Sequence, residues 1–188
     1  MKKSFIVWFL AAGLLVISAP ARGAVKNFIK NGGFEQIGHN NIPAGWNLIA
    51  DRGTKFDATF DTTEKHSGTY SYKIIIDPPG GRVTLYPKPK SLLPISPGKT
   101  YEMSFWIKVK NLDYNSFFLA PVARLNFKPQ RFDVLPTIDL MEKLKGNSEW
   151  TNLTLRATAP KNAKHLVVDF ILTKGTIWLD DIVIRKIK

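Results

Sequence analysis

Two acidic signatures stand near opposite ends of the chain. Asn31-Gly32-Gly33-Phe34-Glu35 lies near the beginning, and Thr176-Ile177-Trp178-Leu179-Asp180-Asp181-Ile182 lies near the end. Each places carboxylates beside large apolar residues in a segment whose pattern indicates a β-strand. A carboxylate is costly to bury unless a positive group or a set of hydrogen-bond donors compensates its charge. A cation shared between the two signatures would compensate both.

The other reactive side chains favour no catalytic arrangement. His66 and Ser67 are adjacent, and neighbouring residues of an extended chain are expected to point to opposite sides, so we predict no hydrolase triad there. Asp180 and Asp181 are expected to point apart for the same reason. They make a poor pair for glycoside hydrolysis, which needs two carboxylates about 5 to 9.5 Å apart in an open groove. We therefore expect a protein that is not an enzyme.

The N-terminal segment has the composition of a secretory signal peptide. Lys2 and Lys3 precede an apolar run over residues 5–17, and the small residues Ala19-Pro20-Ala21 follow it. The run has about 13 residues, fewer than the roughly 20 that cross a bilayer. We expect a cleaved signal over residues 1–21 and one domain over residues 22–188, with no transmembrane segment. The mature protein is expected to be secreted, periplasmic or at the cell surface.

Composition limits the classes of partner. The chain has no cysteine and a formal net charge of +12, and its basic residues are scattered singly. Without disulfides, an exported domain depends on its hydrophobic core for stability. The charge favours acidic partners, and outside the cell these are glycans, wall polymers or membrane head groups more readily than nucleic acid. We expect a monomer that does not bind nucleic acid.

Apolar and polar residues alternate with a period of two along most of the chain. Residues 101–110 show it most clearly: Tyr101, Met103 and Phe105 begin one face, whereas Trp106 and Lys108 lie on the other. Such alternation is typical of half-buried strands. Further strands are predicted at residues 56–60, 70–76, 82–85, 120–128, 151–158, 166–172 and 177–187, separated by Gly- and Pro-rich turns. The sequence therefore predicts an all-β sandwich of the jelly-roll type, with one helical turn expected within residues 138–145.

The ordered motifs resemble the carbohydrate-binding modules of families 4, 9 and 22. The resemblance covers essentially the whole mature chain and rests on six motifs: Asn31-Gly32-Gly33-Phe34-Glu35, Pro43-Ala44-Gly45-Trp46, His66-Ser67-Gly68-Thr69-Tyr70-Ser71, residues 101–108, Trp150 before a strand, and Ile177-Trp178-Leu179-Asp180-Asp181-Ile182. It implies a galactose-binding-domain-like sandwich with a glycan cleft on one sheet. It also implies a structural calcium ion at the rim of the sandwich.

The resemblance implies particular calcium ligands. Carried over residue by residue, they are Glu35, either Asp61 or Glu64, a carbonyl near Thr69 in the Ser-Gly turn, and either Asp180 or Asp181. Calcium prefers six to eight oxygen ligands that mix carboxylates and carbonyls. The alternative from the residues alone is that these carboxylates flank strands at the surface and pair with lysines.

The predicted sugar site combines an aromatic ring with polar side chains. Sugar rings present flat C–H faces to aromatic rings, and their hydroxyls need hydrogen-bond partners. Trp46, Trp150 and Trp178 are expected to pack, whereas Trp106 lies on the polar face of its strand. The predicted ligand-binding residues are Trp106, Arg124, Asn126, Lys128, Tyr114 and Arg131.

We therefore expect an exported, noncatalytic carbohydrate-binding module for a polysaccharide or oligosaccharide, and an acidic glycan is a candidate because the chain is basic. One alternative is a structural or interaction sandwich, without a sugar ligand, that binds a protein or the cell envelope. Another is an accessory module of a glycoside hydrolase system. A cleft rimmed by exposed aromatics would favour sugar, whereas a filled face would favour an interaction role.

Overall fold

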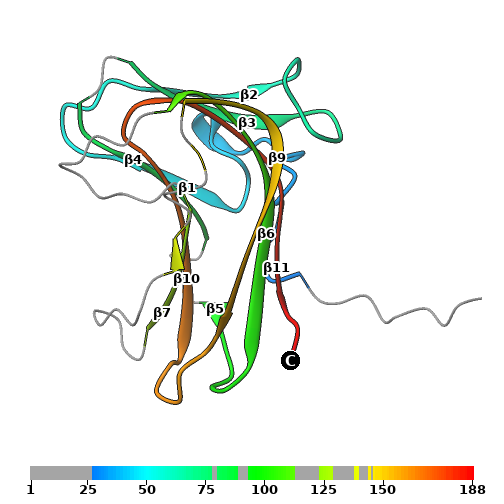
Figure 1. The fold of residues 1–188 in the computed structure, drawn as a ribbon. Coiled ribbons are helices and arrows are strands. Elements are labelled where there is room, and N and C mark those ends of the chain that lie inside the picture. The colour runs from blue at the N-terminus through cyan, green and yellow to red at the C-terminus, as the bar shows by residue number, and fades with distance from the viewer. Residues whose placement is uncertain are drawn as a thin grey trace, which may run out of the picture.

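The protein is a sandwich of two antiparallel β-sheets (Figure 1). The computed structural model describes residues 27–77, 80–88, 93–112, 123–128, 138–139, 144 and 146–188, and at 123–128 and 138–139 it describes the backbone alone. One sheet has six strands in the order β1-β4-β10-β7-β8, with β5 also paired to β10. Its strands are β1 (Trp46–Ala50), β4 (Val83–Pro87), β5 (Leu93–Pro94), β7 (Ala123–Lys128), β8 (Ile138–Asp139) and β10 (His165–Leu172).

The second sheet has five strands in the order β2-β3-β11-β6-β9. They are β2 (Asp57–Asp61), β3 (Ser71–Ile76), β6 (Thr100–Leu112), β9 (Gly146–Thr158) and β11 (Gly175–Lys186). A 3-10 turn, η1 (His39–Asn41), precedes them. In the described part of the chain, no helix is long and apolar enough to span a membrane. The all-β sandwich predicted from the sequence is confirmed.

The core lies between the two sheets and follows the alternation seen in the sequence. On β6, Tyr101, Met103, Phe105, Ile107 and Val109 are all at most 1% exposed and belong to one apolar cluster. Successive side chains of a strand point to opposite faces, so the intervening residues of β6 lie on the outer face of the five-stranded sheet. Trp46 is fully buried, as predicted.

Three strands were not predicted from the sequence. β1 follows the Gly45 turn, β5 has only two residues, and β8 occupies the start of the segment in which a helical turn was expected. There Ile138 and Asp139 pair with Leu125 and Arg124 of β7. The helical expectation is therefore wrong for these two residues, because cross-strand pairing overrides their local preference. Most of the remainder of that segment lies outside the described residues.

Candidate functional site

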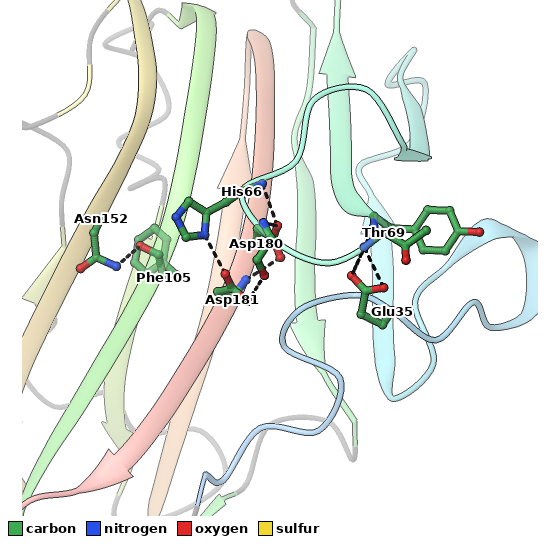
Figure 2. Close-up of polar contacts among 9 residues, drawn as sticks. Glu35, His66, Thr69, Phe105, Asn152, Asp180 and Asp181 are labelled. Atoms are coloured by element: carbon green, nitrogen blue, oxygen red, sulfur yellow. Dashed lines mark hydrogen bonds and ion pairs between the residues drawn. The ribbon is translucent and has the colours of Figure 1, made fainter.

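The two acidic signatures meet at one turn, residues 66–70, which we call the clasp turn. Asp180 of β11 is fully buried, and its Oδ2 accepts hydrogen bonds from the backbone N–H groups of His66 and Ser67, both at 3.0 Å. Glu35 accepts from the N–H of Thr69 at 3.0 Å and of Tyr70 at 3.2 Å. The turn is thus held between carboxylates from the two ends of the chain (Figure 2).

Asp180 and Asp181 reach the same turn, although alternation predicted that they point apart. The register of β11 against β6 shifts between Asp180 and Val183, and Asp181 has a φ of 49°. This bulge rotates the Asp181 side chain toward the clasp turn. Its Oδ2 lies 2.7 Å from His66 Nδ1, and its Oδ1 accepts from Ser67 Oγ at 2.9 Å. The prediction of opposed carboxylates is wrong.

His66 and Ser67 also meet at one group, contrary to the prediction that they point to opposite sides. Both side chains contact Asp181, as the preceding distances show. A catalytic triad needs the imidazole between the hydroxyl and the carboxylate, so that the base can take the hydroxyl proton. Here Ser67 Oγ donates to the carboxylate directly, so these three residues do not form a triad in this arrangement.

Two glycines permit the close approach of the segments. A Cβ on Gly32 would lie 2.0 Å from the carbonyl oxygen of Ile182, and Gly32 O accepts from Ile182 N at 2.9 Å. Gly68 has a φ of 60°, and a Cβ there would lie 2.2 Å from Glu35 Oε1. Gly32 has no room for Cβ because backbone atoms of Ile182 occupy that space, whereas at Gly68 the left-handed backbone favours glycine and a Cβ would displace the Glu35 carboxylate.

A small space beside Gly33 is bordered by three acidic residues. An ideal Cβ on Gly33 would lie 3.4 Å from Asp181 Oδ1, 3.8 Å from Asp180 Oδ1 and 4.0 Å from Glu35 Cγ. Among the described residues no Lys or Arg pairs with these carboxylates, and His66 is the one basic partner. An oxygen-only set with excess negative charge suits calcium.

The carboxylates are nevertheless engaged by protein donors. Within the described ranges, no group of three or more His, Cys, Asp or Glu side chains has the arrangement of a metal site. Burial raises the pKa of the Asp180 carboxyl, and the charge of Asp181 adds to this, against hydrogen bonds from the N–H groups of Ser67, Asp181 and His66. A nearby cation would oppose this rise.

Asp61 and Glu64, the two alternatives for one of the predicted calcium ligands, are engaged in other contacts. Asp61 Oδ2 accepts from Trp178 Nε1 at 2.9 Å and lies 3.7 Å from Lys73 Nζ. Glu64 Oε2 lies 3.0 Å from Lys108 Nζ. Burial disfavours the charged form of Asp61, but its hydrogen bonds and Lys73 outweigh this and lower its pKa. Among the described residues, no hydrogen bond or ion pair joins Asp61 or Glu64 to the carboxylates of Glu35, Asp180 and Asp181.

Trp106 lies against the clasp turn, on the outer face of the five-stranded sheet. Its ring stacks on the His66 ring with centroids 3.7 Å apart and planes 13° apart. Trp150 meets the same histidine edge-on at 6.1 Å and is half-buried. Trp178 is 6% exposed beneath Lys73, so its predicted packing role is confirmed.

The structure separates Trp106 from the other predicted ligand-binding residues. Trp106 is on β6 of the five-stranded sheet, whereas Arg124, Asn126 and Lys128 are on β7 of the six-stranded sheet. The prediction of one shared face is wrong, because the alternation within a strand does not say which sheet the strand joins. Tyr114 and Arg131 lie outside the described residues.

The outer face of the six-stranded sheet carries Tyr86 and Asp169, two polar side chains that were not predicted from the sequence. β10 pairs with β7 so that Arg124 stands opposite Asp169 and Asn126 opposite Val167. Asp169 is 8% exposed and Tyr86 of β4 is 7% exposed, yet neither belongs to the core cluster. Alternation along β4 and β10 places both on the outer face. We call Tyr86 and Asp169, together with the predicted ligand residues Arg124 and Asn126 at their backbone positions on β7, the β10 platform. The pairing of β10 with β7 is the information that the sequence alone lacked.

Comparison with known proteins gives one family match. The model of a family described as a carbohydrate binding domain matches residues 26–176. None of the curated proteins compared with the chain matches it.

Three solved structures illustrate the range of proteins with a similar fold. The CBM22-1 xylan-binding domain of Paenibacillus barcinonensis Xyn10C is 15% identical, with 88% of this chain and 97% of that one covered and a TM-score of 0.56. The enzymatically active domain of bacteriophage CBA120 tailspike protein 4 is 16% identical, with a TM-score of 0.60. The match covers 86% of this chain but 21% of that one, so this chain spans about a fifth of its length. The Stig cyclase Fisc of Fischerella sp. TAU is 14% identical, with 85% and 96% covered and a TM-score of 0.59. At these identities the likeness concerns the fold alone.

Proposed function

Because the chain belongs to the carbohydrate binding domain family, we propose that it is an exported, noncatalytic module that binds a polysaccharide or oligosaccharide. The sugar lies on the β10 platform, where it stacks on an aromatic ring and hydrogen-bonds to polar side chains. The protein acts as a monomer. An acidic glycan suits its net charge of +12.

The observation that carries this proposal is the polar composition of the β10 platform. Tyr86 supplies an aromatic ring, Asp169 supplies acceptors, and Arg124 stands opposite Asp169 in the register. Val167 and Ile171, at 5% and 4% exposure, are apolar and flank Asp169 along β10 on the same face. A few polar groups set among apolar ones are typical of ligand sites.

Calorimetry against a panel of neutral and acidic glycans tests the site. Replacing Tyr86 or Asn126 by alanine is expected to weaken binding at least tenfold, because each change removes a stacking or hydrogen-bonding group. Trp106→Ala is the matched control, since Trp106 lies in the other sheet. Binding that depends on Trp106 and not on Tyr86 or Asn126 would place the sugar on the five-stranded sheet instead.

We also propose a structural calcium ion held by Glu35, Asp180 and Asp181 with carbonyls of the clasp turn near Thr69. Calcium would neutralise three carboxylates that no Lys or Arg pairs with among the described residues. Melting of the purified protein with calcium and with chelator tests this. We expect calcium to raise the melting temperature and Asp181→Asn to remove that effect; an unchanged melting temperature would contradict it.

Two simple assays test export and the absence of catalysis. The mass of the mature protein recovered outside the cytoplasm is expected to begin at Arg22, after cleavage of residues 1–21. Incubation with labelled oligosaccharides is expected to release no product. Released product would contradict the noncatalytic assignment, which matters because a cyclase shares the fold.

A second candidate is an interaction domain without a sugar ligand. Burial of Tyr86, Val167, Asp169 and Ile171 on the outer face favours it, because a filled face leaves less room for a glycan. The glycan panel separates the two candidates: no binding to any glycan leaves the interaction role. A role beside a glycoside hydrolase is compatible with either.

A further inference from the structure

We propose that the outer face of the five-stranded sheet carries a second binding site, in which Arg156 and Arg185 bind the carboxylate or sulfate groups of an acidic polysaccharide. This site lies on the opposite side of the sandwich from the β10 platform. It uses no residue of the platform or of the clasp turn.

A glutamate holds the two arginines side by side. Glu102 of β6 pairs in register with Arg156 of β9 on one side and with Arg185 of β11 on the other. Arg156 Nε donates to Glu102 Oε2 at 2.6 Å, and Arg185 Nε donates to Glu102 Oε1 at 2.8 Å. Each carboxylate oxygen therefore fixes one guanidinium group.

The three charged side chains of this cluster differ in their exposure to solvent. The Glu102 side chain is 4% exposed, whereas those of Arg156 and Arg185 are 67% and 43% exposed. Among the described residues, neither arginine pairs with another carboxylate. Each guanidinium has five N–H donors, and the hydrogen bond from Arg156 to Glu102 uses its Nε, while the Arg156 side chain is 67% exposed. The cluster therefore presents one net positive charge and several free donors to solvent.

The glutamate stays ionised and keeps the arginines in place. Burial disfavours its charged form, but the hydrogen bonds and charges of Arg156 and Arg185 outweigh this and lower the pKa of Glu102. An anchored arginine loses less side-chain entropy when it binds a ligand. Guanidinium groups also match the planar geometry of oxyanions better than lysine does.

The neighbouring rows of the sheet suit a saccharide chain. On one side of Glu102 along β6, Thr100 pairs with Thr158, and their hydroxyls are 2.9 Å apart. On the other side, Ser104 pairs with Thr154. Each of these pairs is two residues along the strands from the arginines, a distance of about 6.6 Å at a rise of about 3.3 Å per residue. A polymer lying along β6 would meet hydroxyls on both sides of the charged pair. The net charge of +12 adds long-range attraction to a polyanion.

The test compares binding of the full mature protein to dextran sulfate, polygalacturonate and neutral dextran. We expect both acidic polymers to bind, neutral dextran not to bind through this face, and added salt to weaken binding. Arg156→Gln with Arg185→Gln is expected to reduce affinity at least tenfold. Lys161→Gln with Lys164→Gln is the control, since both lysines are exposed and the charge change is equal. Equal losses in the two double variants would show that only net charge matters and would overturn the site.

A second variant guards against misfolding of the arginine mutant, in which Glu102 would be buried without a partner. Arg156→Lys with Arg185→Lys keeps both positive charges beside Glu102 and removes the guanidinium groups, so we expect it to bind the acidic polymers several-fold more weakly than the wild-type protein. Unchanged or tighter binding by this double variant, once it is shown to be folded, would overturn the proposal. Binding to anionic lipid vesicles in preference to both polymers would also overturn it, and inorganic sulfate at millimolar concentration is expected to compete with dextran sulfate.

Discussion

Alanine at position 68 should separate the fit of the clasp turn from ordinary backbone strain. Gly68 has a φ of 60°, and its Cβ would lie 2.2 Å from Glu35 Oε1. The substitution is therefore expected to strain the backbone and to move the Glu35 carboxylate away from the N–H groups of Thr69 and Tyr70. Gly53 is a matched control, because its φ is 83° and nothing lies within 4 Å of its Cβ position.

The expected magnitudes follow from these contacts. A left-handed conformation costs an alanine about 1–2 kcal/mol. Loss of the Glu35 hydrogen bonds adds about 1–3 kcal/mol at Gly68 alone. A domain of this size melts about 2–4 °C lower for each kcal/mol lost. We expect melting temperatures about 10 °C lower for Gly68→Ala and about 4 °C lower for Gly53→Ala.

Differential scanning calorimetry and urea unfolding measure both variants. In a Glu35→Ala background, Gly68→Ala is expected to cost no more than Gly53→Ala, because the clashing carboxylate is gone. Equal destabilisation of the two glycine variants in the wild-type background would refute the reasoning. It would mean that Glu35 does not rest against the turn.

Three further outcomes follow from described contacts. Trp46→Ala is expected to cost about 3–5 kcal/mol of unfolding free energy because the ring is fully buried, whereas Ile49→Ala, at a side chain 49% exposed, should cost under about 0.5 kcal/mol; similar values would contradict the packing. His66→Ala should remove the stacked partner of Trp106 and change the near-ultraviolet circular dichroism, and an unchanged spectrum would argue against the stack. Because the folded pKa of Glu102 lies below its ordinary value of 4.5, its contribution is present above that pH and is lost as the pH falls through the folded pKa. Acid titration should therefore destabilise the wild type more than Glu102→Gln, and parallel curves would contradict this.

Much of the fold could be predicted because apolar and polar residues alternate along most of its strands. The core face of β6 follows directly from the period-two pattern of Tyr101, Met103 and Phe105. The short strands β5 and β8 have too few residues for such a pattern, so their pairing with β10 and β7 became evident only in the structure.

The site was less predictable because it depends on distant backbone. The meeting of the two acidic signatures was expected, but the φ of 49° at Asp181 breaks the alternation and brings the Asp181 carboxylate to the same turn as that of Asp180. His66 stacks on Trp106 from 40 positions away, and no local pattern encodes that contact. The assignment of Trp106 and Arg124 to different sheets likewise depends on strand order.

Affinity gel electrophoresis of the mature protein is the decisive test of glycan binding at the β10 platform. We expect at least one soluble polysaccharide in the gel to retard the wild-type protein, and Tyr86→Ala, but not Trp106→Ala, to restore its mobility. Unretarded migration of the folded wild type in every polysaccharide tested would contradict this binding.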